Sequence, residues 1–142
     1  MRWIWIDKFV DFVPGVSATA VKNVSLAEEH LHDQYAAFPI VPHSLIIEGM
    51  AQTGGILVGH ARDFSEKVIL AKIGRATFHR LSRPGDTLRL QLRVMAVRPS
   101  ETRPDRGIIT NRFVTVNQRG EPVQEMVASA IIPKRNPEGT TK

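Results

Sequence analysis

The chain has 142 residues, which is the size of one domain with a hydrophobic core. It contains no cysteine, so disulfide bonds and cysteine-based metal sites are excluded and a reducing compartment is compatible. The formal net charge of +5 favours an acidic partner, such as nucleic acid, an anionic membrane or an acidic carrier protein, although a solvated basic surface is the commoner explanation.

No segment predicts export or membrane insertion. The first twelve residues, MRWIWIDKFVDF, alternate and include Asp7 and Lys8, which is unlike a signal peptide. The most apolar run, from Leu45 to Val58, is interrupted by Glu48 and is too short to span a bilayer. We therefore expect a soluble cytoplasmic protein without a membrane span.

Two strands are predicted before a helix. Residues 2–12 have alternating bulky side chains and residues 16–26 are alternating and β-branched, and a Pro14-Gly15 turn separates them. Residues 27–42 form a loop that is long for a compact domain, and long ordered loops are often functional. Pro42 fits the first turn of the helix, because the N–H that proline lacks is not needed there.

Four further strands are predicted at residues 67–81, 86–97, 107–117 and 121–133. The segments 98–106 and 117–120 between them look like hairpin connections. This order predicts an α+β fold in which a sheet wraps one long helix. We expect a single domain over residues 1–133, followed by a frayed tail, 134–142, which has no apolar anchor.

The helix carries one polar stripe. Ser44, Glu48 and Gln52 are spaced by four residues and share a face, which two glycines extend, while the remaining positions are apolar nearly all round. Such a helix is expected to be buried. Each helical glycine costs about 1 kcal/mol relative to alanine, so close approach of another backbone or a ligand is the expected compensation. The helix has four: Gly49, Gly54, Gly55 and Gly59.

The segment from residue 21 to residue 57 resembles the active-site region of the FabZ/FabA-type 3-hydroxyacyl-acyl-carrier-protein dehydratases. It reads VKNVSLAEEHLHDQYAAFPIVPHSLIIEGMAQTGGIL. The matching positions are Lys22, Asn23, Val24, Ser25, Pro39, Pro42, Leu45, Glu48, Ala51 and Gln52. With the similar first strand and the RPGDTLRLQL segment, the resemblance extends over nearly the whole chain from Trp3 to Pro133.

The resemblance implies a hot-dog fold, a curled antiparallel sheet around one central helix, in a homodimer or higher homo-oligomer. It implies that Glu48 lies at a tunnel for an acyl-phosphopantetheine chain carried by acyl carrier protein or coenzyme A, with Pro42, His43, Ser44 and Gln52 as substrate-binding positions. The His43 N–H at the helix start would polarise the thioester carbonyl. No cofactor, bound metal or nucleic-acid partner is expected.

One position departs from the family pattern. Gln34 stands where the family has its catalytic histidine, and a glutamine amide can orient a substrate but cannot act as a base. Three alternatives for the base remain: His32 after a shift of the loop, His43 at the helix start, or Glu48 performing all the proton chemistry.

Three functions therefore stay open: a dehydratase with altered catalytic groups, an acyl thioesterase in which Glu48 activates water, and a non-catalytic acyl-binding or partner subunit. The run His30-x-His32-Asp33 is interpreted as a solvated loop rather than a metal site, and His60 and His79 as structural or surface residues. Arginines beyond the helix are candidates for a basic rim that binds an acidic carrier, namely Arg75, Arg80, Arg83, Arg89, Arg98, Arg103 and Arg106.

Overall fold

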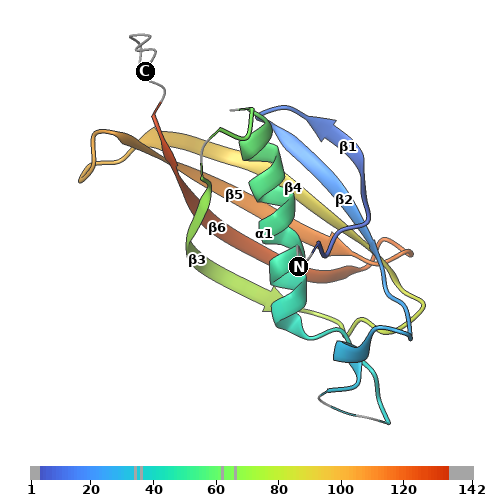
Figure 1. Ribbon diagram of the computed structural model, residues 1–142. Helices are drawn as coiled ribbons and strands as arrows, with labels where there is room; N and C mark the ends of the chain where they lie inside the picture. The colour runs from blue at the N-terminus through green and yellow to red at the C-terminus, as the bar shows by residue number, and fades with distance from the viewer. Residues whose placement is uncertain (1–3, 34, 36, 62, 66, 135–142) are drawn as a thin grey trace.

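The computed structural model describes residues 4–33, 35, 37–61, 63–65 and 67–134. Its elements are β1 (Lys8–Val13), β2 (Ser17–Asn23), the short 3-10 helix η1 (Glu29–Leu31), α1 (His43–His60), β3 (Ile69–Phe78), β4 (Thr87–Pro99), β5 (Arg106–Val116) and β6 (Pro122–Pro133). Among these residues the strands form one six-stranded antiparallel sheet in the order β1-β2-β4-β5-β6-β3, which curls around α1 (Figure 1). The predicted order of two strands, a helix and four strands is confirmed.

Several element boundaries differ from the prediction by a few residues, most of all at the first strand. The first strand begins at Lys8 rather than near residue 2, because Trp5 and Ile6 are buried against the core instead of pairing in the sheet. Pro42 is the residue that precedes α1 rather than a residue of its first turn. The two hairpins are confirmed, since β4 pairs with β5 and β5 pairs with β6.

The core lies between α1 and the inner face of the sheet. Ile46, Met50 and Leu57 are fully buried, and they pack in one cluster with inward side chains of the sheet such as Leu90 and Phe113. This arrangement buries one side of the helix, whereas the side that carries Ser44 and Glu48 is exposed or partly buried. The expectation of burial all round was wrong for the single chain, because the sheet covers the helix from one side.

Lys22 and Asn23 of the sequence motif do not line a pocket with Glu48 but connect separate segments of the fold. Lys22 is 8% exposed, and its ammonium lies 3.1 Å from Oε1 of Glu28 and 4.5 Å from the centroid of the Trp5 ring. The Asn23 side chain donates to Asp7 at 3.0 Å. These contacts join β2 to the segment before β1 and to the loop before α1.

In the part of the chain that the structure describes, no helix is long and apolar enough to cross a membrane. Of the predicted tail, 134–142, only Lys134 is among the described residues, and its backbone N–H donates to the Asp105 carbonyl oxygen at 2.7 Å. The single domain over residues 1–133 stays a prediction.

Candidate active site

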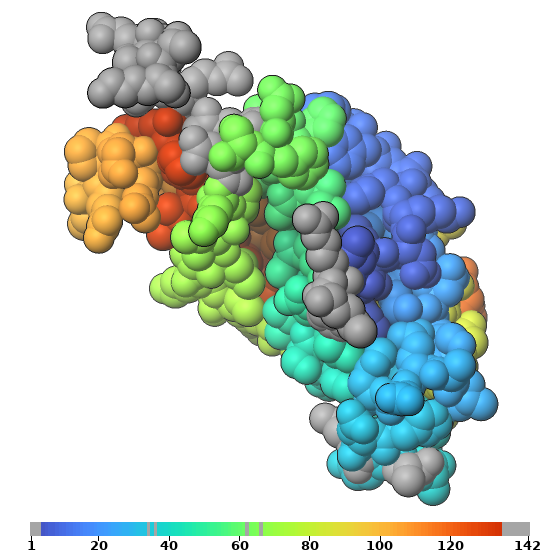
Figure 2. Space-filling view, in the orientation of Figure 1, coloured from blue at the N-terminus to red at the C-terminus, as the bar shows by residue number. Residues whose placement is uncertain are grey.

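A pocket of about 180 Å³ lies between α1 and the β3 side of the sheet. Its lining consists of Glu48, Ala51, Gln52, Gly54, Gly55, Val68, Leu70, Asn111, Phe113 and Ala130. In the space-filling view, orange-to-red atoms of the sheet are visible in the hollow between α1 and β3 (Figure 2). The lining is mostly apolar or small, which is typical of a site for an apolar chain.

Among the described residues of this lining, Glu48 is the only titratable one, and a short chain of hydrogen bonds holds it in place. The Trp5 backbone N–H donates to Oε1 of Gln52 at 2.7 Å, and Nε2 of Gln52 donates to Oε1 of Glu48 at 3.0 Å. Because the first bond fixes which end of the Gln52 amide faces Trp5, the N–H end must face Glu48. Within the described residues, Oε2 of Glu48 accepts no hydrogen bond and stays available to an occupant of the pocket.

The start of α1 offers two backbone donors. No side chain caps the helix, and among the described residues the N–H groups of His43 and Ser44 have no acceptor. Unpaired N–H groups at a helix N-terminus attract negative charge. The His43 ring is exposed and stacks on Phe78 with the ring centroids 3.9 Å apart, and it does not line the pocket.

Apart from Gln52, the other predicted site residues that the structure describes do not line the pocket with Glu48. Gln34 lies outside the described residues. Nε2 of His32 lies 3.0 Å from the Leu26 carbonyl oxygen, so this ring is held within its own loop. No cluster that could hold a metal ion is found over the described ranges. His60 and His79 are exposed, as expected for surface residues.

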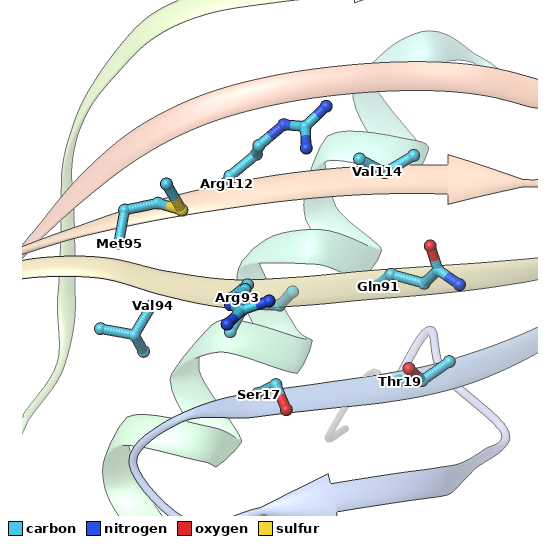
Figure 3. A pocket seen from close by; sticks show the side chains of 9 residues that line it. Ser17, Thr19, Gln91, Arg93, Val94, Met95, Arg112 and Val114 are labelled. Atoms are coloured by element: carbon cyan, nitrogen blue, oxygen red, sulfur yellow. The ribbon is translucent and has the colours of Figure 1, made fainter.

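A larger hollow of about 590 Å³ lies on the opposite, outer face of the sheet. Figure 3 shows it with α1 behind the strands, and its side chains include Thr19, Gln91, Arg93 and Arg112. Its described lining contains no carboxylate or histidine, and Arg112 is already paired with Glu125 at 3.2 Å. The smaller pocket that contains Glu48 is therefore the candidate site for acid–base chemistry.

Asn111 is the pocket residue that sequence reasoning missed. It is 3% exposed and lies on β5. The signal was present in the alternation of this strand, since Ile109, Asn111 and Phe113 occupy successive inward positions and one of them is an amide. A polar residue at an inward position of a strand calls for a hydrogen-bond partner.

Comparison with known proteins agrees with this architecture. The solved structure of a MaoC-like dehydratase from Rhodospirillum rubrum matches 92% of this chain and 99% of its own with a TM-score of 0.62 at 24% identity. A hypothetical thioesterase from Streptococcus pneumoniae with coenzyme A matches 91% and 90% of the two chains with a TM-score of 0.63 at 10% identity. The curled sheet around one helix is therefore the hot-dog fold.

The sequence comparisons narrow the class to a family. A model of the FabA-like domain matches residues 4–121. The FabZ 3-hydroxyacyl-[acyl-carrier-protein] dehydratase of Campylobacter hominis is 39% identical over 97 residues, covering 66% of this chain and 67% of that protein. The FabZ protein of Symbiobacterium thermophilum is 40% identical over 97 residues, or 68% of each. The chain belongs to the FabA-like family, as the sequence motif indicated.

Proposed function

We propose that the protein is a 3-hydroxyacyl-thioester dehydratase, a hydro-lyase that converts its substrate to the 2-enoyl thioester and water. The observation that carries this proposal is Glu48, which is the only titratable group among the described residues of a mostly apolar pocket. Gln52 holds it through one carboxylate oxygen and leaves the other unpaired. Membership of the FabA-like family supports the same reaction.

Dehydration requires one proton to leave C2 and one to join the departing C3 hydroxyl. The C2–H electron pair forms the new C2–C3 π bond, and the C3–O bond breaks with its pair going to oxygen. A single carboxylate can perform both transfers, because Glu48 accepts the C2 proton and then delivers it to the hydroxyl, which leaves as water. Neither His32 nor His43 lines the pocket, which favours Glu48 in both roles.

Two further groups complete the proposed site. The His43 N–H at the start of α1 donates to the thioester carbonyl and stabilises the negative charge that develops when the C2 proton leaves. Gln34, which lies outside the described residues, orients the substrate from the loop before the helix. The acyl group reaches the site on the phosphopantetheine arm of acyl carrier protein or coenzyme A, as the FabZ relatives suggest.

The proposed assembly is a homodimer or higher homo-oligomer formed through the edge of β3. This strand ends the sheet and presents Ile69, Leu70 and Ile73 with 53%, 41% and 38% of their surface exposed. An edge strand with unpaired backbone groups and apolar side chains is a template for pairing with a second chain. Such a partner would also cover the open side of α1 beside the pocket.

The carrier and the compartment remain part of the proposal. Three arginines of the suggested basic rim are engaged in ion pairs, Arg80 with Glu121, Arg98 with Glu101 and Arg106 with Asp105. The others stay candidates for an acidic carrier surface, and binding through them should weaken as salt is added. We expect the enzyme to work in the cytoplasm.

The test is turnover of two matched thioesters, 3-hydroxyoctanoyl-CoA and octanoyl-CoA, with products identified by mass spectrometry. The dehydratase forms the enoyl thioester from the first and leaves the second intact, whereas a thioesterase releases free acid from both. Glu48→Gln should lower the rate by about 10²-fold or more, because it removes the acid–base group and keeps the shape. Glu101→Gln, on an exposed hairpin, is the matched control and should keep full activity.

Variants of the loop and the helix start identify the base. Gln34→His should raise the dehydration rate by restoring the family's histidine. If His32 or His43 supplied the base, its alanine variant would lose activity as fully as Glu48→Gln does. Wild-type turnover in Glu48→Gln would overturn the assignment of the active site.

A further inference from the structure

Trp5 contacts α1 through its backbone as well as through its ring. The residue precedes β1 and is 3% exposed, and its N–H donates to Oε1 of Gln52 at 2.7 Å. Two residues later the Asp7 N–H donates to the Val21 carbonyl oxygen of β2 at 2.8 Å. The Trp5 N–H is therefore directed at the helix, whereas the chain that follows it turns into the sheet.

The contacts of the Trp5 ring leave this N–H little freedom to move. The Lys22 ammonium lies 4.5 Å from the ring centroid, and the His30 ring packs edge-on with a centroid distance of 4.9 Å. On the helix side, a Cβ on Gly49 would lie 2.7 Å from Cδ1 of Trp5. Gly49 and Gln52 are three residues apart and are neighbours on the helix surface. Trp5 is thus held against α1 at two adjacent points, one through its ring and one through its N–H.

The N–H decides which way the Gln52 amide points. Rotation about the last bond of a glutamine side chain has two broad minima that exchange the oxygen and the nitrogen. An N–H can only donate, so Trp5 selects the orientation with Oε1 toward itself, and Nε2 then donates to Oε1 of Glu48 at 3.0 Å. In the reversed orientation an amide oxygen would face a carboxylate oxygen, and neither can donate to the other.

Holding Glu48 in one place matters for proton transfer. Glu48 is only partly buried, and a glutamate side chain has several rotamers open to it unless a bond fixes one. Proton transfer needs the carboxylate oxygen at hydrogen-bonding distance from the reacting atom, and a misplacement of about 1 Å can cost about 100-fold in rate. Fixing Glu48 before the substrate arrives therefore raises the rate of the chemical step more than it raises affinity.

We propose that Trp5 is a positioning residue for the reaction: its backbone N–H sets the orientation of the Gln52 amide and so holds Glu48 in its reactive position. Trp5 is not part of the described lining of the pocket and acts through Gln52. The inference rests on the proposed role of Glu48 as the acid–base group. Losing this N–H should lower kcat by about tenfold and leave KM nearly unchanged, because one hydrogen bond is lost and the substrate contacts stay in place.

The test removes the N–H and keeps the ring. Indole-3-lactic acid incorporated in place of Trp5 replaces the backbone amide by an ester. Turnover of 3-hydroxyoctanoyl-CoA is measured for this protein, for Gln52→Met, which keeps the side-chain length and removes the amide, and for the two changes combined. The ester should lower kcat by about tenfold in the wild-type background and have almost no effect in the Gln52→Met background. An equal loss in both backgrounds, or an unchanged kcat in the first, overturns the inference.

The same ester at Ile4 is the matched control. Ile4 is 70% exposed and its N–H donates to no described residue, so this ester should keep the wild-type kcat. If the Trp5 ester does not fold, Gly49→Ala is the second route, because its methyl group displaces the Trp5 ring. Gly49→Ala should lower kcat in the wild-type background and not in the Gln52→Met background. An unchanged kcat, or the same loss in both backgrounds, contradicts the positioning role.

A measurement without turnover separates this inference from the proposed function. The carbon-13 chemical shift of the Glu48 carboxyl group reports its surroundings. It should change when the Trp5 ester or Gly49→Ala is introduced into the wild-type protein and stay the same when either is introduced into Gln52→Met. That result in a protein that dehydrates no 3-hydroxyacyl thioester overturns the proposed function and keeps the positioning of Glu48 by Trp5. A carboxyl shift that does not respond in the wild-type background overturns the positioning itself.

Discussion

Two glycines of α1, Gly49 and Gly55, carry the same local cost and have opposite surroundings. Each lowers helix stability by about 1 kcal/mol relative to alanine. A Cβ on Gly49 would lie 2.7 Å from Cδ1 of Trp5 and 2.8 Å from Cδ2 of Leu90. A Cβ on Gly55 would meet nothing within 4 Å. Contacts within the chain explain why residue 49 has no side chain, but they do not explain the glycine at residue 55.

These surroundings distinguish two sides of α1: a packing side, which contains Gly49 and faces the core, and a binding side, which contains Gly55 and faces the pocket. Gly49 lets α1 approach Trp5 and the sheet closely, so its lost helix propensity is offset by contacts of the core. Gly55 lines the pocket beside Glu48, and no described residue uses its space. An acyl chain or a second copy of the protein is the remaining explanation for a small residue there.

Gly49→Ala should produce the largest change in stability. The added methyl group has no room between two buried side chains, and overpacking of this kind typically costs 1–3 kcal/mol. The gain in helix propensity offsets about 1 kcal/mol of this, so we expect a net loss of up to about 2 kcal/mol in the free energy of unfolding. Urea denaturation of the variant and the wild type measures it. A variant as stable as the wild type would show that Trp5 can move aside and that the two glycines do not differ.

Gly55→Ala should change stability in the opposite direction. With open space around the new methyl group, the helix gains up to about 1 kcal/mol in the free energy of unfolding. The same methyl group intrudes on the pocket, where one misplaced carbon is worth about a 10- to 200-fold change in kcat/KM. Urea denaturation and steady-state kinetics on 3-hydroxyoctanoyl-CoA test both parts. Greater stability with unchanged kcat/KM would remove Gly55 from the binding side.

The fold was predictable because its signals are local and periodic. Alternation of apolar and polar side chains predicted the strands and so the positions of the turns between them. The spacing of Ser44, Glu48 and Gln52 predicted that they share one helix face. The alternating start of the chain was misjudged, since Trp5 has strand-like neighbours but packs against α1. Local pattern cannot distinguish a residue that pairs in a sheet from one that fills a core.

The site was only partly predictable, because its contacts are distant in sequence. Glu48 was found from its family spacing, but the bond from the Trp5 N–H to Gln52 joins residues 47 positions apart. Burial of the helix was expected because most of its residues are apolar. An apolar pattern does not show whether the sheet covers one side of a helix or all of it. Asn111 could be assigned to the pocket only once β5 and α1 were known to enclose it.

Gly59→Ala tests whether a short distance alone makes a glycine necessary, and the expected effect is the smallest of the three. A Cβ on Gly59 would lie 2.8 Å from Cδ1 of Phe64, nearly as close as the contacts of Gly49. The Phe64 ring, however, is 63% exposed, so it can turn away, although its backbone N–H is bonded to the Gly59 carbonyl at 2.9 Å. We expect a change within about 0.5 kcal/mol of zero in the free energy of unfolding, since the gain in helix propensity and the cost of displacing the ring roughly cancel.

A double-mutant cycle with Phe64→Ala isolates the contribution of the ring, because Gly59→Ala should become stabilising by up to about 1 kcal/mol once the ring is gone. If Gly59→Ala is instead as destabilising as Gly49→Ala, distance rather than the freedom of the neighbouring side chain decides the outcome, and the two sides of the helix are less distinct than Gly49 and Gly55 indicate.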